Sequence, residues 1–519
     1  MRNTGQQVFA DIRPVAGVDL NMGVLFEQGV TGKGVVVGVM EPGSIDPLQE
    51  DLMANLVLKD GGGAAPQSQA DAHTTAVAGI IAAVALNGKG GRGVAPGAKL
   101  LDMQAPGVHT QPVPRVINNS EGMPTAGYMP FAMDGADADF DMLTKPTLPL
   151  IIKAAGNGYI ENGGRSIAEC TAATRASGAG CMPANAEAFN ALPGVLVVGA
   201  VNAAGRNASY ASTGSVLWVA APGGESGHQR AYALKAGALP EKAARLPEAF
   251  FAPAVTSTDV MGCDKGVNKD GVAVNALDFG SRSPVDKSCN YMAVMTGTSA
   301  AAPMVSGVIA MMLQVNPSLG WREIKYILAT TARKIQPLEA GIRWNDFTVD
   351  GGWVTNAAGR AFSNRYGFGL VDASAAVDLA RRFKPLPALV QPRWHNYDGP
   401  PVAIPYRSDD AGFAAITVED DLTIETVQLR VKTTHRTPGN VRIMLVWPSG
   451  TRSIIAPALS ASSLLGDEFD IGLTASNAFL DERSKGTWKL QVVDAVDPSS
   501  ATSSALRSWQ ILVLGTRAN

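Results

Sequence analysis

Valine- and isoleucine-rich runs alternate with segments of helical periodicity over residues 1–384 of this chain. The runs are apolar at consecutive positions, which is typical of parallel strands that helices cover on both faces. The pattern therefore predicts an α/β fold with a doubly wound parallel sheet. The expected strands are Val35–Met40, Leu100–Gln104, Arg115–Asn119, Leu150–Ala154 and Val195–Val201, and the expected helices are His73–Ala85, Thr298–Val315 and Trp321–Thr331.

The sequence changes character near residue 385. Residues 385–404 contain many prolines and few periodic apolar positions, which predicts a linker. Residues 405–519 contain β-branched or alternating runs separated by turn signals, and strands at that spacing indicate an all-β sandwich. Its expected strands are Thr423–Val431, Val441–Trp447, Thr487–Val493 and Trp509–Leu514.

Composition and charge exclude several classes of partner. The 519 residues include 43 Lys and Arg against 46 Asp and Glu, so the net charge is −3. Such a balance offers no basic surface for nucleic acid. No uninterrupted apolar stretch reaches the roughly 18 residues that span a bilayer. We therefore expect no nucleic-acid partner, no membrane span and a monomeric chain.

The four cysteines fall into two local groups, each within a loop-rich stretch. We expect disulfides between Cys170 and Cys181 and between Cys263 and Cys289, although four cysteines allow three pairings and free thiols are an alternative. Disulfides persist in oxidising compartments. The polar start at Met1 carries no signal peptide. We therefore expect the mature form of a secreted or periplasmic protein.

A small-residue motif, Gly297-Thr298-Ser299-Ala300-Ala301-Ala302-Pro303, opens the longest apolar helix. A hydroxyl in the first turn of a buried helix is accessible and yet held still. The helix N-terminus also supplies positive partial charge where an oxyanion would form. Ser299 is therefore a candidate nucleophile. The alternative is a hydroxyl that caps a core helix.

Two further side chains could serve such a nucleophile. His73 is the first residue of a predicted helix rich in small residues. None of the other four histidines begins such a helix. Asn157 follows the strand Leu150–Ala154, at the end of a strand where α/β sheets place ligand sites. The alternatives are a structural histidine and an Asn-Gly turn.

Several motifs in order resemble the subtilisin-like serine proteases (subtilases), and specifically the kexin-like branch with a C-terminal, jelly-roll-like P domain. The resemblance implies a serine endopeptidase in which Ser299 is the nucleophile, His73 the general base and Asn157 an oxyanion donor. It also implies that Ser120, Glu121 and Gly122 form the strand that pairs with substrate. The matching segments include Thr31-Gly32-Lys33-Gly34-Val35, Gly93-Val94-Ala95-Pro96, Asn119-Ser120-Glu121-Gly122, Ala155-Gly156-Asn157-Gly158 and Gly486-Thr487-Trp488-Lys489-Leu490.

The chain departs from the family at the triad acid. The family has aspartate after the first strand, whereas here Val35–Met40 runs into Glu41. Glu41 is the expected acid, but its extra methylene requires a shift that matters for positioned catalysis. Asp46 is a rival. A degenerate triad is the third possibility, and the chain would then be a non-catalytic relative that binds peptides or partners.

The resemblance also bears on specificity and cofactors. Kexin-like enzymes prefer Lys or Arg at P1, and here Glu121, Glu161 and the acidic run Asp134, Asp137, Asp139 and Asp141 could read that charge. The alternative is that these are solvated loop charges. Structural calcium is expected by resemblance, with Asp51 and Asn87 as loose matches to family ligands. A protein or peptide substrate is the expected partner, and a propeptide or dedicated chaperone is a further one.

Overall fold

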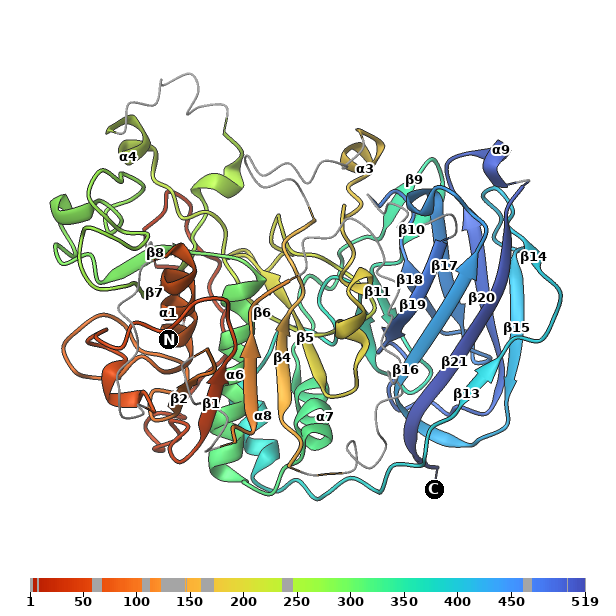
Figure 1. Ribbon diagram of the computed structural model, residues 1–519, viewed down its shortest axis with the longest axis horizontal. Coiled ribbons are helices and arrows are strands. Elements are labelled where there is room, and N and C mark those ends of the chain that lie inside the picture. Colours follow the sequence, from red (N-terminus) through yellow and green to blue (C-terminus); the bar gives the residue numbers. More distant parts are fainter. Residues whose placement is uncertain are drawn as a thin grey trace.

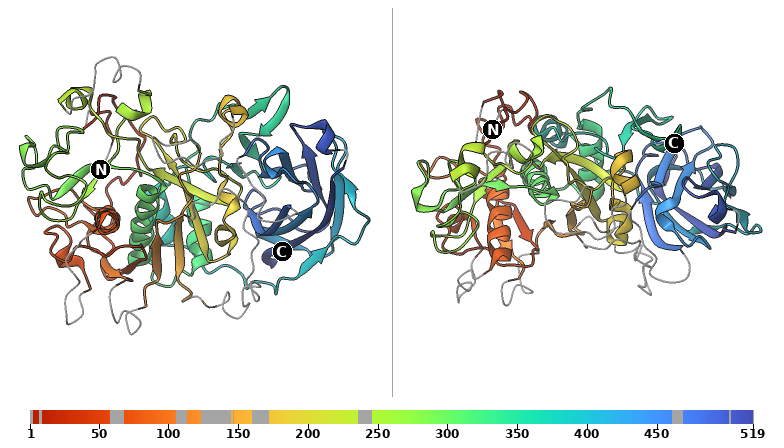
Figure 2. Two further views of the ribbon diagram at one scale, coloured as in Figure 1. Left: turned by 45° about the horizontal axis from the view of Figure 1, so that its top comes forward. Right: turned by 90° about the horizontal axis from the view of Figure 1, so that it is seen from above.

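The computed structural model describes residues 3–6, 9–57, 68–104, 113–122, 145, 147–159, 172–235, 246–460, 469–501 and 503–518. An α/β domain lies beside a β-sandwich formed by the C-terminal part of the chain (Figure 1). Two further views show the same side-by-side arrangement (Figure 2). The predicted fold class is confirmed.

A six-stranded parallel sheet forms the centre of the first domain, in the order β2-β1-β3-β4-β5-β6. The direction of strand progression reverses at β1, which lies between β2 and β3. In open α/β sheets, ligands bind beyond the carboxyl ends of the strands at such a point. Sequence periodicity predicted every strand except β6. The strands are β1 (Val36–Val39), β2 (Lys99–Asp102), β3 (Val116–Asn119), β4 (Leu150–Ala154), β5 (Val195–Val201) and β6 (Leu217–Pro222).

Two helices that pack against each other lie beside this sheet, α1 (Gln69–Ala82) and α6 (Thr298–Val315). A reciprocal capping box between Ser68 and Asp71 begins α1, so the helix starts four residues before the predicted His73. Strands β3 to β6 all contact α6. The bounds predicted for α6 and for α7 (Trp321–Thr331) are confirmed. A fourth helix, α8 (Ala373–Ala380), packs on α6 and α7.

Among the described residues, α6 is the one helix whose length and composition would suit a membrane span, and 83% of it is buried inside the protein. Its neighbours on the sheet and on α1 account for that burial. We therefore interpret α6 as the core helix of the α/β domain.

The other elements of the first domain are short. The helices are α3 (Ala172–Ser177), α4 (Arg230–Lys235), η1 (Met53–Asn55), η3 (Ala184–Ala186), η4 (Ala188–Ala191), η5 (Glu248–Phe251) and η6 (Gly280–Arg282). The strands form three antiparallel pairs, β7 (Val255–Thr258) with β8 (Tyr291–Met295), β9 (Ile342–Trp344) with β10 (Phe347–Asp350), and β11 (Trp353–Thr355) with β12 (Ala361–Ser363).

The C-terminal domain consists of two antiparallel sheets. One contains β13 (Trp394–Asn396), β21 (Ala505–Arg517), β16 (Leu422–Thr433) and β19 (Phe469–Ser476), with β14 (Val402–Ala403) also on β21. The other contains β15 (Phe413–Val418), β20 (Gly486–Asp494), β17 (Val441–Val446) and β18 (Arg452–Ala456). The short helices are η7 (Pro438–Asn440) and α9 (Pro498–Ala501). Two strands of the first sheet, β13 and β14, lie within the predicted linker.

Buried contacts join the two domains. The amide of Asn185, in η3, donates to Thr474 Oγ1 at 2.9 Å and to the Ala475 carbonyl at 3.1 Å, both on β19. One apolar cluster combines Val197 of β5 with Leu473 and Ala475 of β19. Such shared burial indicates that the domains stabilise each other.

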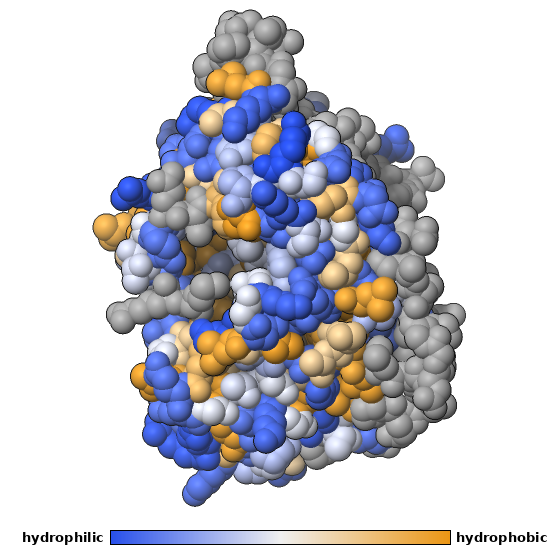
Figure 3. All heavy atoms as spheres, turned by 90° about the vertical axis from the view of Figure 1, so that its left-hand side faces the viewer, coloured by the Kyte–Doolittle hydropathy of each residue, from blue (hydrophilic) through white to orange (hydrophobic). Residues whose placement is uncertain are grey.

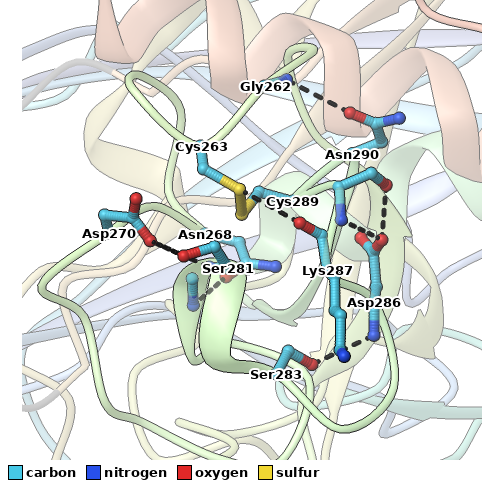
Figure 4. Close-up of a disulfide and its surroundings, with 12 residues drawn as sticks. Gly262, Cys263, Asn268, Asp270, Ser281, Ser283, Asp286, Lys287, Cys289 and Asn290 are labelled. Atoms are coloured by element: carbon cyan, nitrogen blue, oxygen red, sulfur yellow. Dashed lines mark hydrogen bonds between the residues drawn. A yellow bond between two sulfur atoms is a disulfide. The ribbon is translucent and has the colours of Figure 1, made fainter.

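Loops between β6 and β8 cover one side of the first domain (Figure 1). The predicted Cys263–Cys289 disulfide joins the two ends of the connection between β7 and β8 (Figure 4). Cys181 is also disulfide-bonded, and its predicted partner Cys170 lies outside the described residues. Seen from this side, most of the described surface is hydrophilic, with scattered apolar patches (Figure 3).

Candidate active site

The carboxyl ends of β1, β3 and β4 bring three of the predicted site residues to one edge of the sheet. Glu41 follows β1, Ser120 follows β3 and Asn157 follows β4. His73 in α1 and Ser299 in the first turn of α6 meet them there. Strand order therefore explains the assembly, because parallel neighbours end on the same side.

Glu41 faces His73 across a short gap. Its Oε1 accepts hydrogen bonds from the Ser120 N–H at 2.7 Å and from Asn118 Nδ2 at 3.0 Å. Its Oε2 lies 3.6 Å from His73 Nδ1. Neither of these facing atoms, both buried, has a hydrogen-bond partner among the described residues. Each is thus the natural partner of the other once the gap closes slightly.

Burial controls the charges of this pair. The Glu41 side chain is fully buried, whereas 32% of the His73 side chain is exposed. Burial raises the pKa of Glu41 to about 8, although hydrogen bonds from Ser120 and Asn118 oppose the shift. Burial also lowers the pKa of His73. Both shifts favour an uncharged resting pair.

Asp46, the alternative triad acid, is hydrogen-bonded to the backbone of two loops. Its Oδ1 accepts from the Leu48 N–H at 3.0 Å, and its Oδ2 accepts from the Met261 N–H at 2.9 Å. Both oxygens are therefore engaged with backbone donors, and Asp46 ties the loop after β1 to the loop after β7. This arrangement favours Glu41 as the acid.

Ser299 is held at the start of α6 by an unusual backbone. Its Oγ donates to the Ser120 carbonyl at 2.9 Å, and Ser120 Oγ donates back to the Ser299 carbonyl at 3.1 Å. The preceding Gly297 has a φ of 112°, which side chains disfavour. A Cβ on Gly297 would also lie 3.0 Å from Asn157 Nδ2. Glycine is therefore required where the helix begins.

The amide of Asn157 is oriented by the same helix end. Its Oδ1 accepts from the N–H and from the Oγ1 of Thr298, both at 2.9 Å. Thr298 Oγ1 in turn accepts from the Gly156 N–H at 3.1 Å. With its oxygen fixed in this way, the exposed Asn157 can offer Nδ2 as a donor. The N–H groups of the first helical turn lack intrahelical acceptors and can donate beside it.

The segment predicted to pair with substrate, Ser120–Gly122, directly follows β3 and is not itself assigned to a strand. Ser120 is buried, whereas Glu121 and Gly122 are exposed. A Cβ on Gly122 would lie 3.4 Å from the Gly156 Cα, so the two segments approach closely. The other predicted acidic determinants lie outside the described residues, namely Glu161, Asp134, Asp137, Asp139 and Asp141.

Two family models match the chain. Residues 32–369 match the subtilase family, and residues 424–513 match the proprotein convertase P-domain. The first match spans more than half of the chain. This chain belongs to the subtilase family.

The subtilase has relatives along its whole length. It is 31% identical to the Aeromonas extracellular serine protease of Aeromonas sobria, over 100% of this chain and 90% of that protein. It is 27% identical to Furin-like protease 2 of Drosophila melanogaster, over 96% of this chain and 27% of that protein. The crystal structure of the Aeromonas sobria serine protease matches with a TM-score of 0.83 and 29% identity, covering 99% of this chain and 94% of that one.

A second crystal structure, of the Aeromonas sobria protease with the chaperone ORF2, also gives a TM-score of 0.83, at 28% identity, covering 100% of this chain and 94% of that one. These matches identify the subtilase as a serine endopeptidase with a P domain. The alternative of a non-catalytic binding protein has no support among them.

The predicted metal ligands of this subtilase lie together. Asp51 is fully buried, and Asn87 Nδ2 donates to its Oδ1 at 2.6 Å. The Oδ2 of Asp51 is buried without a hydrogen-bond partner among the described residues. Burial raises the pKa of Asp51. No group of three or more His, Cys, Asp or Glu side chains gathers in the described parts of the chain.

A large cavity lies elsewhere in the subtilase. It has a volume of about 770 Å³ and lies between the N-terminal segment, α1 and β7. Its lining includes Phe9, Phe26 and Ile80 but none of the predicted site residues. It is therefore separate from the candidate active site.

Three residues that organise the site were not predicted from the sequence. Asn118 and Thr298 orient Glu41 and Asn157, and Lys153 donates to the Glu121 carbonyl. Lys153 carried a usable signal, because a lysine interrupts the otherwise apolar strand Leu150–Ala154. The other two are short polar residues, one inside a predicted strand and one at the first position of a predicted helix, and nothing in the sequence distinguishes them.

Proposed function

We propose that this subtilase is a secreted endopeptidase that hydrolyses peptide bonds through Ser299, His73 and Glu41. The observation that carries the proposal is the separation of 3.6 Å between Glu41 Oε2 and His73 Nδ1. The second carboxylate oxygen is already anchored by the Ser120 N–H. Glutamate can therefore serve as the acid. The hydrogen bond from the Ser120 N–H fixes one carboxylate oxygen, and the longer side chain still directs the other oxygen toward His73.

In the proposed reaction, the Ser299 hydroxyl leaves the Ser120 carbonyl and turns toward the His73 imidazole. As Oγ attacks the scissile carbonyl carbon, the imidazole takes the hydroxyl proton. Ionised Glu41 then stabilises the imidazolium through Nδ1–H. The imidazolium next protonates the leaving amine, and water hydrolyses the acyl-enzyme by the same proton transfers in reverse roles.

The tetrahedral oxyanion would be stabilised by two donors, Asn157 Nδ2 and the Ser299 N–H. The hydrogen bonds from Thr298 to Asn157 Oδ1 support this assignment because they leave the amide nitrogen available. The Ser120 carbonyl, released by the hydroxyl, is then free to accept a substrate N–H. Substrate binding and activation of Ser299 would thus be linked.

For specificity we propose a preference for Lys or Arg at P1. Its support is the exposed carboxylate of Glu121 on the substrate strand and the similarity to a furin-like protease. We also propose a propeptide or dedicated chaperone as folding partner, because the similar Aeromonas sobria protease crystallises with a chaperone. Secretion is proposed from the extracellular relative.

We further propose a structural calcium ion held by Asp51 and Asn87. The buried, unpartnered Oδ2 of Asp51 fits a hard cation that prefers oxygen ligands. Calcium bound to the folded state raises stability by mass action. Chelation should therefore lower the Tm of the parent protein and should shift that of Asp51→Asn much less. Equal shifts in both proteins would contradict the assignment.

A fluorophosphonate probe tests the catalytic proposal. We expect labelling of the parent chain, none of Ser299→Ala, and slower labelling of Glu41→Asp, because the shorter side chain cannot both accept from the Ser120 N–H and face His73. The labelled parent should also cleave peptides with Arg at P1 faster than peptides with Leu. A parent chain that is folded and yet resists the probe would overturn the proposal.

A further inference from the structure

A charged side chain lies inside the central sheet, directly under the substrate strand. Lys153 is the one charged residue of β4, and only 3% of its side chain is exposed. A buried ammonium is unfavourable unless it is paired and hydrogen-bonded. Its partners therefore indicate what it does.

Lys153 Nζ has a carboxylate and two carbonyls as partners. It lies 3.3 Å from both carboxylate oxygens of Glu187. It also donates to the Ala154 carbonyl at 3.1 Å and to the carbonyl of Glu121. The ammonium thus links its own strand to the predicted substrate strand, with Glu187 supplying the compensating charge.

Three backbone groups of the segment Ser120–Gly122 form hydrogen bonds with side chains other than that of Ser299. Glu41 accepts from the Ser120 N–H, Asn119 Oδ1 accepts from the Glu121 N–H at 3.2 Å, and Lys153 donates to the Glu121 carbonyl. The Ser120 carbonyl, in contrast, faces the Ser299 hydroxyl. These three hydrogen bonds fix the segment, while the Ser120 carbonyl remains the acceptor of the Ser299 hydroxyl.

Glu187 comes from the domain interface. It lies between η3 and η4, and both of these helices contact β19 of the P domain. Its neighbour Asn185 makes the hydrogen bonds to Thr474 and Ala475. The ion pair therefore lies between the P-domain contact and the substrate strand.

We propose that Lys153, paired with Glu187, is a positioning residue that holds the segment Ser120–Gly122 in register for substrate pairing. This inference rests on the proposed peptidase function. It predicts that the pair supports hydrolysis of extended peptides, which use the strand, much more than reaction of Ser299 with a small probe.

The test compares Lys153→Met with the parent enzyme. We expect fluorophosphonate labelling at nearly the parent rate, while kcat/KM for an extended peptide falls about tenfold or more. Lys153→Arg should restore part of the loss. Lys325→Met is the matched control, because Lys325 is also buried but donates at 3.0 Å to the Pro193 and Val195 carbonyls, away from the substrate strand. It should leave the ratio of peptide hydrolysis to labelling unchanged.

Glu187→Gln keeps the ammonium in place and carries the test if Lys153→Met does not fold. We expect it to lower peptide hydrolysis selectively, and the double variant should lose less than the sum of the single losses. An unchanged ratio in folded Lys153 and Glu187 variants, or equal losses of labelling and hydrolysis, would overturn the inference. A parent chain that fails to label would instead contradict the proposed function.

Discussion

At the scale of single residues, the site depends on how one carboxylate is shared. One oxygen of Glu41 accepts from the Ser120 N–H, and the other faces His73. A residue with two such duties must keep both geometry and charge. The Gln and Asp variants separate these duties, because Gln keeps length and loses charge whereas Asp does the reverse.

The pH dependence of activity follows from the burial of Glu41. Burial raises its pKa to about 8, and only the ionised form stabilises the imidazolium. We therefore expect kcat/KM of the parent to rise with pH through about 8, with the carboxylate and imidazole titrating as a coupled pair. Glu41→Gln should lose about 10⁴-fold in kcat and show no such limb. A parent limb near the ordinary carboxyl pKa would contradict this prediction.

The pH dependence of the free energy of unfolding tests the raised pKa of Glu41 independently of activity. The folded pKa of Glu41 lies above its ordinary value of 4.5, so the folded state retains a proton that the unfolded state has released. The stability contributed by Glu41 is present below about pH 4.5 and is lost as pH rises through about 8. The free energy of unfolding of the parent should fall relative to Glu41→Gln across that range.

Asn157 can be tested without disturbing its neighbour. Asn157→Asp retains an oxygen for Thr298 and removes the Nδ2 donor. We expect kcat to fall by about 10²–10³-fold with little change in KM, because the donor acts only on the oxyanion. Steady-state kinetics and a melting curve suffice, and an unchanged kcat would remove Asn157 from the oxyanion hole.

At the scale of elements, the loop after β1 approaches α1 as closely as backbones allow. A Cβ on Gly43 would lie only 2.3 Å from the backbone of Ala70. The approach brings the residues after Glu41 against the first turn of the helix that carries His73. Glycine is required here by contact rather than by a left-handed backbone.

We expect Gly43→Ala to push the Glu41 loop away from α1 and to widen the gap to His73. Positioning errors of about 1 Å can lower rates about 10²-fold, so kcat/KM should fall markedly. Gly91→Ala is the control, because a Cβ there meets nothing within 4 Å. If both variants keep parent activity, the close approach has no catalytic importance.

At the scale of the whole molecule, the P domain completes the fold of the α/β domain. Trp394 of the predicted linker packs in a cluster with Val197 and Leu473. Arg322 of α7 also pairs with Glu425 of β16, with Nε 2.9 Å from Oε2. The Pro-rich segment is therefore packed against both domains, and Trp394–Asn396 contributes a strand to the sandwich.

Removing the P domain should consequently expose apolar surface and buried polar groups. We expect a chain that ends at residue 384 to lose cooperative unfolding and solubility, and the full chain to unfold in a single calorimetric transition. Retained solubility with an unchanged Tm in the shortened chain would show that the domains are independent.

The local pattern of the sequence was sufficient for the fold class and for the central strands and helices of the first domain. Consecutive apolar residues marked the buried strands, and the predicted bounds of α6 and α7 were correct. The start of α1 was misplaced because its capping box precedes the apolar pattern. Strands β13 and β14 were missed because their pairing with β21 is not visible locally.

Part of the candidate site could likewise be predicted from the sequence, and part could not. The sequence alone nominated Ser299, His73, Glu41 and Asn157, because each lies at or just beyond the end of a predicted element, at a position that matches the family's site. Only the tertiary structure favoured Glu41 over Asp46 as the proposed acid, and only it placed the Lys153 ammonium against the Glu121 carbonyl. The reason is physical: these choices depend on hydrogen bonds between residues far apart in the chain, such as the 79 positions between Glu41 and Ser120, and local periodicity carries no information about such contacts.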